Sequence, residues 1–243
     1  MFRNVFNIIK TNIYTIFIVI LAFTLMRTYG SINSEYIKDN GVITLFSFYK
    51  VVFNTHFVLL FILPSYIVIN YQLTNFYIEY KVLLRYQGSK FLWWKELILS
   101  QLKLSLLFAV AINLIFVVSV LINGVTQVLN PFFIFVLIII FSIETLGFLI
   151  ISVSSLLVLF IISNKFFTNI IIYTFIVVPV LVKGFIYKEI YSFSDYMFLV
   201  NIVELEMFFI KGCSVFFWFL LILVLLLMIN LKQIKRKDIL WRS

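Results

Sequence analysis

The sequence predicts an all-α integral membrane protein with six transmembrane helices, and three observations support this prediction. Hydrophobic residues occupy 64% of the 243 positions and the mean hydropathy is +1.15, well above the apolar share of a soluble domain. The apolar residues form six runs, each close to or longer than the roughly 20 residues that a helix needs to cross a bilayer. The basic residues gather in alternate connections between these runs. Because little chain lies outside the runs, we expect residues 1–243 to form one membrane domain.

The predicted spans are residues 11–28, 49–71, 98–123, 131–161, 166–187 and 212–231. Pro131 suits the opening of the fourth span, because proline is favoured in the first turn of a helix. That span is long enough to tilt, kink or break. Pro64 and Pro179 lie inside the second and fifth spans, where each frees a backbone carbonyl and permits a hinge. The alternative is a proline that the membrane helix simply tolerates.

The N-terminus and the two longest connections on the other side of the membrane contain further elements. Residues 29–48 are rich in Gly, Ser, Asn and Asp, which predicts an external loop. Residues 188–210 mix four acids with apolar residues and predict a short external helix or helical hairpin before the sixth span. Residues 1–10 predict a helix in the membrane interface, or else the start of the first span, because four apolar residues recur at helical spacing: Phe2, Val5, Phe6 and Ile9.

Residues 72–103 form the longest predicted cytoplasmic connection. Here we expect a helix, a break at Gly88, and a second helix with Ser89 as its N-cap. Trp93 and Trp94 then mark the lipid-headgroup level at which the chain enters the third span. The break would project away from the membrane.

Charge sets the orientation. Thirteen of the 19 Lys and Arg residues lie in the two termini, in residues 72–103 and in the turn around Lys165. Basic residues near helix ends stay in the cytoplasm, so both termini and the 72–103 connection are predicted to be cytoplasmic. The net charge of +9 therefore indicates orientation and contact with lipid headgroups, and no nucleic-acid partner is expected.

The motifs of common enzymes are missing from the sequence. It contains no phosphate-binding loop, no nucleophile elbow and no zinc-protease signature. We therefore expect no catalytic residue, no metal and no cofactor on this chain, and no enzyme activity of its own. An intramembrane peptidase using Cys213 and His56 is a less favoured alternative, because a lone cysteine in an apolar helix is usually a packing residue.

Two ionisable residues within the spans are candidates for a pathway or an interface. Glu144 is the only carboxylate deep in a span, where an isolated charge is costly. It either lines a pathway or is a neutral acid hydrogen-bonded to a Ser or Asn. His56, with Pro64 and Pro179, completes this candidate set, although a structural role, bonded to Thr55 or to a backbone carbonyl, is favoured for this histidine.

The stretch LLRYQGSKFLWWKELILSQLKLS, from Leu83 to Ser105, resembles the basic and aromatic segment before the third span in permease subunits of bacterial type-2 ABC exporters. The predicted architecture resembles that family along the whole chain. The resemblance implies that the 72–103 connection forms a coupling helix, which docks into a separately encoded ATPase. The docking residues that it implies are Glu79, Lys81, Arg85, Tyr86, Gln87, Gly88, Ser89 and Lys90.

The resemblance also implies partners. ATP and Mg²⁺ would bind the ATPase subunit, and a second permease, identical or related, would complete a dimer. The substrate would be amphipathic or hydrophobic, most often a peptide in antimicrobial-peptide export or immunity. The Ile, Phe, Asn and Lys usage suggests the cell membrane of a low-GC Gram-positive bacterium. A six-span substrate-binding component of an ATP-driven uptake system is the alternative.

Overall fold

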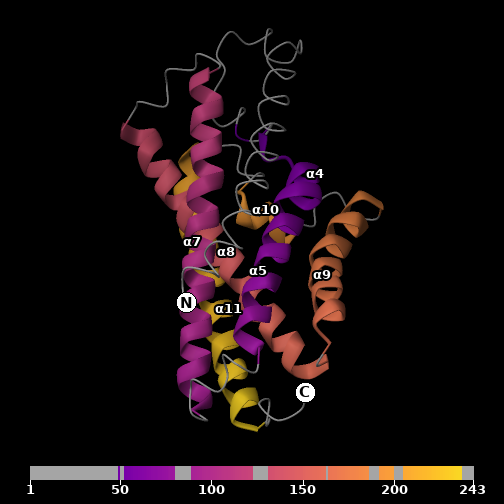
Figure 1. The fold of residues 1–243 in the computed structure, drawn as a ribbon. Helices are drawn as coiled ribbons and strands as arrows, with labels where there is room; N and C mark the ends of the chain where they lie inside the picture. The colour runs from indigo at the N-terminus through magenta and orange to yellow at the C-terminus, as the bar shows by residue number, and fades with distance from the viewer. Residues whose placement is uncertain are drawn as a thin grey trace, which may run out of the picture.

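The computed structural model describes residues 49, 52–79, 89–122, 131–162, 164–185, 192–199 and 205–236, and the regular structure in these ranges is helical (Figure 1). The predicted interfacial helix at 1–10, the first span at 11–28 and the external loop at 29–48 lie outside the described residues. The helices are α4 (Thr55–Phe57), η1 (Val58–Ile62), α5 (Leu63–Ile78), α7 (Lys90–Ile122), α8 (Pro131–Ile162), α9 (Lys165–Phe185), α10 (Phe193–Met197) and α11 (Leu205–Arg236).

Four of these stretches are long and apolar enough to cross a membrane: Thr55–Ile78, Lys90–Val118, Ile134–Ile162 and Ile210–Lys235. They coincide with the second, third, fourth and sixth predicted spans, and they support a multi-pass membrane protein. α9 occupies the position of the fifth span, although its apolar part is shorter, Phe166–Val182.

The second span is one rod made of α4, η1 and α5, and it ends seven residues beyond the predicted residue 71. The prediction ended the span at 71 and assigned the polar residues after it to the cytoplasmic connection. In the structure they remain helical because some of them face the protein, and Thr74 is only 7% exposed. Pro64 is the second residue of α5, directly after the π-helical turn η1. Such a turn leaves room for a proline that cannot donate a backbone hydrogen bond.

α7 begins at Lys90, where the second helix of the connection was predicted to begin, and it continues without interruption into the third span predicted from residue 98. Ser89 is its N-cap as predicted, since the Leu92 amide donates to the Ser89 Oγ over 3.4 Å. No glycine or proline interrupts the helix between Lys90 and Ile122. Its 33 residues extend about 50 Å, well beyond a hydrocarbon core of about 30 Å.

The two tryptophans at the start of α7 face the protein interior. Trp93 is 2% exposed and Trp94 is 8% exposed, and the Trp93 ring lies 6.3 Å from the Phe160 ring of α8. They were predicted to mark the lipid-headgroup level. Both side chains are buried in the protein rather than exposed, while their level in the membrane stays a prediction.

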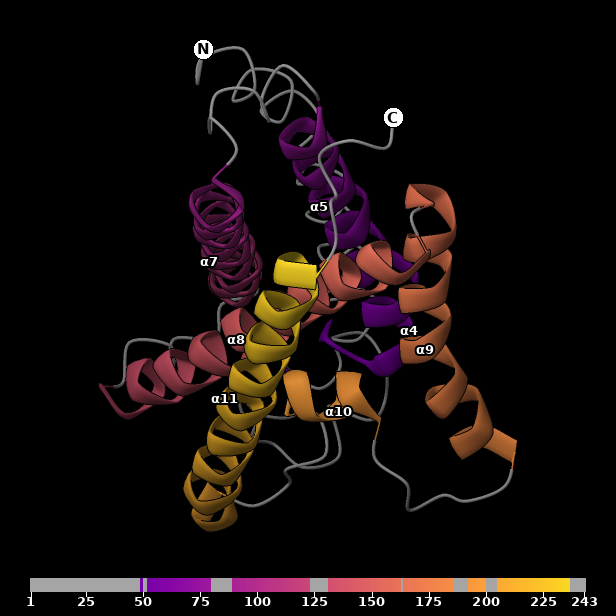
Figure 2. The same ribbon diagram turned by 90° about the horizontal axis from the view of Figure 1, so that it is seen from below.

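α8 is the central helix and contacts α5, α7, α9, α10 and α11 (Figures 1 and 2). It begins at Pro131, as predicted. The seven consecutive residues 147–153 are all buried. Seven residues make almost two turns, so every side of α8 is covered at this level.

α10 is a five-residue helix before α11, in the region where a short helix was predicted. A capping box holds its start, because the Ser192 amide and hydroxyl donate to Asp195 Oδ2 over 2.9 and 2.8 Å, while the Asp195 amide donates back to Ser192 Oγ. Thr55 also donates to Asp195 over 3.0 Å, which joins α10 to α4. α11 then begins at Leu205 rather than at the predicted residue 212.

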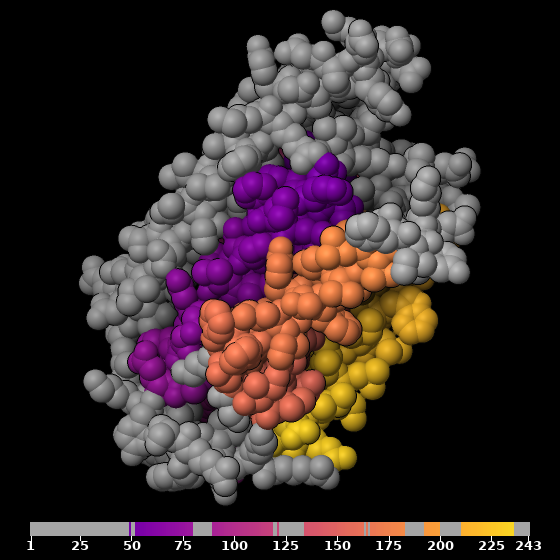
Figure 3. Space-filling view, turned by 90° about the vertical axis from the view of Figure 1, so that its right-hand side faces the viewer, coloured from indigo at the N-terminus to yellow at the C-terminus, as the bar shows by residue number. Residues whose placement is uncertain are grey.

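The outer surface of the bundle is apolar. Figure 3 shows α9 and α11 on one face with the α4–α5 rod beside them. α11 exposes large side chains along its length, such as Phe217 at 67%, Trp218 at 62% and Met228 at 63%. Such a surface suits lipid tails, which explains why an all-apolar helix is stable there without protein around it.

Candidate functional site

Polar side chains inside the bundle are the candidate sites, because hydrocarbon offers them no hydrogen-bond partner. In the described ranges they meet at three levels between the second span, α7 and α8, and a fourth group lies between α5, α8 and α9. The levels are centred on Glu144, Tyr66 and Tyr77 in turn.

Glu144 lies on α8 with no exposed surface. Its Oε1 accepts from the Tyr49 hydroxyl over 3.0 Å, and its Oε2 accepts from the Asn113 amide over 2.5 Å. The Asn113 amide also donates to the Ala109 carbonyl. The two donors orient both carboxylate oxygens, so Glu144 ties α7 and α8 to the residues just before α4. These contacts favour the hydrogen-bonded alternative, while a role in a pathway stays a prediction.

Tyr66 forms the second level and connects three helices. Its hydroxyl lies 2.8 Å from Ser105 Oγ of α7 and 2.5 Å from Ser152 Oγ of α8. The Tyr66 ring packs against Phe108 and Phe148, with centroids 5.2 and 4.5 Å away. A fully buried phenol is stable here because both ring and hydroxyl have partners.

The third level is the corner where α5 ends and α7 begins, called here the α5–α7 corner. The Trp93 indole donates to the Tyr77 carbonyl over 2.9 Å, and the Tyr77 hydroxyl lies 2.5 Å from Ser100 Oγ. Tyr77 and Trp93 are both buried. The two helix ends are therefore fastened together at the place where residues 80–88 connect them.

Three of the predicted docking residues flank this corner. Glu79 is exposed directly after α5, while Ser89 caps α7 and Lys90 opens it. The remaining five lie outside the described residues: Lys81, Arg85, Tyr86, Gln87 and Gly88.

The remaining predicted residues do not gather into one site. His56 is exposed on α4, and Cys213 is exposed on α11 with a free thiol. Pro179 lies within α9, and Pro64 follows η1. Within the described ranges, no group of three or more His, Cys, Asp or Glu residues is placed to hold a metal ion.

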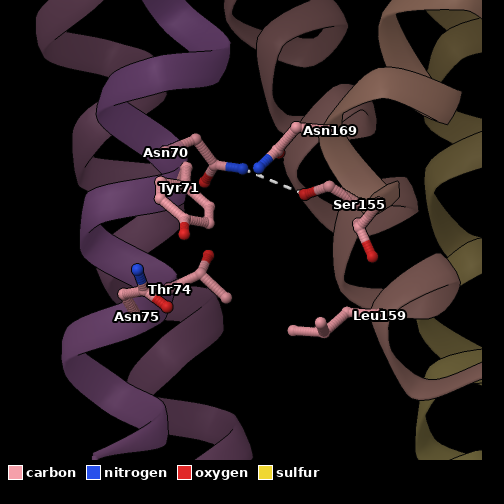
Figure 4. Close-up of a pocket in the computed structure, with 8 residues that line it drawn as sticks. Asn70, Tyr71, Thr74, Asn75, Ser155, Leu159 and Asn169 are labelled. Atoms are coloured by element: carbon pink, nitrogen blue, oxygen red, sulfur yellow. Dashed lines mark hydrogen bonds between the residues drawn. The ribbon is translucent and has the colours of Figure 1, made fainter. Parts of the chain in front are cut away.

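A polar pocket of about 10 Å³ lies between α5, α8 and α9 (Figure 4). Asn70 donates to Ser155 Oγ over 3.0 Å across it. Three buried oxygens of α5 have no hydrogen-bond partner among the described residues: Asn70 Oδ1, Thr74 Oγ1 and Asn75 Oδ1. The lining residues are Asn70, Tyr71, Thr74, Asn75, Ser155, Leu159, Thr168 and Asn169.

The sequence analysis did not single out this pocket, Tyr66 or the α5–α7 corner. One signal could have indicated them. Tyr66, Asn70, Thr74 and Tyr77 follow one another at spacings of four, four and three, which places them on one side of a helix. The prediction ended the second span at 71 and so divided this polar stripe between a span and a loop.

Searches with this chain against protein-family models, curated proteins and solved structures found no match.

Proposed function

We propose that this chain is the membrane-spanning permease subunit of an ATP-driven exporter, and that the segment 80–88 with its flanking residues receives the movement of a separate ATPase. The observation that supports this proposal is the α5–α7 corner. A force on residues 80–88 reaches two helices that are fastened to each other by Tyr77 and Trp93.

The corner favours transmission of movement over local bending. Because the Trp93 indole and the Tyr77 hydroxyl bind in a buried position, pulling α5 away from α7 would leave buried polar groups unpaired. α5 and α7 also both contact α8, the central helix. A load at the corner would therefore move the helices as a unit, as domain-scale coupling requires.

The resemblance to type-2 ABC exporters supports the proposed partner subunits. Because the chain has no phosphate-binding loop, ATP and Mg²⁺ would bind the ATPase. Two permease subunits, identical or related, would enclose the pathway. Resemblance to type-2 ABC exporters supports an amphipathic or hydrophobic substrate, a peptide above all.

Affinity purification of the chain in mild detergent, followed by mass spectrometry and ATP-hydrolysis measurements, tests the proposal. We expect a nucleotide-binding ATPase in a ratio of two ATPases to two permeases. Arg85→Glu should abolish the stimulation of ATP hydrolysis by the permease and leave its amount in the membrane unchanged. Lys232→Glu, the same charge reversal at an exposed residue of α11, is the control and should keep the stimulation.

Two outcomes would contradict the proposal. If no ATPase accompanies the chain in several detergents, it is not an ABC permease. If one copy of the chain is found with two ATPases and a different scaffold protein, the chain is an uptake component instead.

A further inference from the structure

Three side-chain oxygens on the α5 side of the pocket between α5, α8 and α9 lack a hydrogen-bond partner among the described residues. Asn70 is 2% exposed and Thr74 is 7% exposed, yet Asn70 Oδ1, Thr74 Oγ1 and Asn75 Oδ1 find no partner among the described residues. In Figure 4, Asn70, Thr74 and Asn75 lie on the α5 side of the pocket, opposite Ser155 and Asn169. Unpaired acceptors of this kind are costly, so a ligand that supplies donors would be favoured.

The position of the pocket along the helices indicates where the ligand comes from. Thr74 and Asn75 lie three to four residues before the end of α5, and Thr168 and Asn169 lie as far after the start of α9. At 1.5 Å per residue this depth is about 5–6 Å. The headgroup layer of a bilayer is about 5–8 Å thick on each side. Taking the ends of α5 and α9 as the outer edge of the headgroup layer places the pocket close to the boundary between headgroups and acyl chains.

The size and charge of the pocket limit the ligand. A volume of about 10 Å³ holds one water-sized group. None of the eight lining residues carries a charge, whereas Mg²⁺ and Ca²⁺ sites use carboxylates. A water molecule has two donors and can accept from the Thr74 hydroxyl, whereas Asn70 Oδ1 and Asn75 Oδ1 only accept. A primary ammonium has three donors and no acceptor, which matches the three unpaired oxygens in number.

The pocket is also accessible from the surface. Tyr71, Asn75 and Asn169 are all partly exposed, so the stem of a ligand has a way out. Further along α9, the exposed side chains Ile170, Ile171 and Phe175 offer an apolar surface for acyl chains.

We propose that this pocket binds the primary ammonium of a phosphatidylethanolamine headgroup, with Asn70, Thr74 and Asn75 as the acceptors. The site recognises N–H donors and so discriminates against phosphatidylcholine, whose quaternary ammonium has none and is larger. This proposal does not depend on the transport function proposed above.

The test compares the thermal stability of the purified chain in vesicles of phosphatidylcholine alone and in vesicles with added phosphatidylethanolamine. A ligand that binds the folded state raises the unfolding temperature. We expect phosphatidylethanolamine to raise the unfolding temperature. Its N,N-dimethyl derivative should raise it by only a fraction of that amount. Equal stability in all three lipids would overturn the proposal.

Two variants locate the site. Thr74→Val and Asn75→Leu each remove one acceptor at nearly constant volume. Each should reduce the affinity for phosphatidylethanolamine about tenfold, because one hydrogen bond to a charged group is lost. In pure phosphatidylcholine Thr74→Val should be at least as stable as the parent, because it removes an unpaired buried hydroxyl. Thr145→Val is the matched control, since Thr145 is also 7% exposed but its hydroxyl donates to the Phe141 carbonyl of its own helix.

Two further arms separate other donors from the lipid. One arm uses phosphatidylcholine vesicles and replaces choline chloride in the buffer by NaCl. If Na⁺ then stabilises the chain as much as phosphatidylethanolamine does, the ligand is an inorganic cation and the proposal is wrong. Free ethylamine with the same effect would show that a soluble ammonium, rather than a lipid, occupies the pocket. A lipid preference retained in both Thr74→Val and Asn75→Leu would place the site elsewhere and overturn the assignment.

Discussion

Glu144 presents two carboxylate oxygens to two donors, Tyr49 and Asn113, in a buried position between helices. A glutamine at 144 has one carbonyl acceptor and one NH2 group, so it keeps both partners only if the Tyr49 hydroxyl turns to accept. Glu144→Gln thus alters the hydrogen bonds while hardly altering the side-chain volume. The effect of this substitution on stability and on transport therefore distinguishes a structural role from a pathway role.

Glu144→Gln is expected to lower the unfolding free energy by about 0.5–1.5 kcal/mol, because one of the two hydrogen bonds to the carboxyl group must be lost or rearranged. Glu96→Gln, the same substitution at an exposed site on α7, should change it by less than about 0.5 kcal/mol. Thermal unfolding of both variants in detergent gives the comparison. Unchanged stability in Glu144→Gln together with altered transport would instead support the pathway role.

Gly147 of α8 is in close contact with α10. A Cβ atom at this position would lie 2.6 Å from Met197 Cγ and 2.8 Å from its sulfur. Glycine therefore allows α10 to lie directly on the central helix, and no larger residue fits without moving Met197.

Gly147→Ala is expected to destabilise the fold by about 1–3 kcal/mol through overpacking. Gly212→Ala on α11 is the control: its Cβ would lie 3.2 Å from one methyl group of Ile139, so its effect should be smaller. If Met197→Ala in the same chain restores stability, the contact is confirmed as the cause. Equal melting temperatures for both glycine variants would show that Met197 moves aside at no cost.

At the scale of elements, the α5–α7 corner depends on one of two adjacent tryptophans. The Trp93 indole N–H donates to the Tyr77 carbonyl, whereas the Trp94 indole N–H has no partner in the described part of the chain. Both rings are buried. The pair therefore supplies its own matched comparison for the hydrogen bond that joins the two helices.

Trp93→Phe should cost about 1 kcal/mol more stability than Trp94→Phe, because it removes a made hydrogen bond in addition to ring area. If the corner transmits movement, Trp93→Phe should also reduce the stimulation of the ATPase, and Trp94→Phe should retain most of it. Equal effects of the two substitutions on both measurements would show that the corner hydrogen bond has no special role.

At the scale of the whole molecule, the distribution of basic residues predicts the side of the membrane at which each helix end lies. The end of α11 carries Lys232, Lys235 and Arg236, which predicts a cytoplasmic position. α10 precedes α11 and is predicted to lie at the other side. Four long apolar helices agree with a multi-pass chain and leave the orientation to experiment.

Membrane-impermeant maleimide labelling of single cysteines tests this orientation, in a Cys213→Ser background. Lys235→Cys, at an exposed position, should react in inverted membrane vesicles and stay unlabelled in intact cells. Tyr196→Cys on α10, where the side chain is 44% exposed, should show the opposite pattern. The reverse result at both positions would invert the topology and place residues 80–88 outside the cytoplasm, where no ATPase could reach them.

The composition and the apolar runs determined the class of this protein, because a bilayer accepts only long apolar helices with satisfied backbones. Three local features were predictable for another reason, since each depends on residues near in the sequence. They are the start of α8 at Pro131, the N-cap at Ser89 and the short helix before α11. The C-terminal end of the second span and the N-terminal end of the third span differ from the prediction. A polar residue such as Thr74 remains in a helix when a neighbouring helix covers it, and a hydropathy pattern has no information about neighbours.

Only the tertiary structure decided which polar groups meet. Glu144 and Asn113 are 31 positions apart, Tyr66 and Ser152 are 86 apart, and the pocket takes its residues from three helices. Hydrogen bonds depend on distances of about 3 Å, which follow from how α5, α7, α8 and α9 pack rather than from local preference. The sequence by itself thus determined that the chain is an all-helical membrane protein with a basic, aromatic connection. The packing around α8 determined where that connection is anchored and which oxygens near α9 are left without a partner.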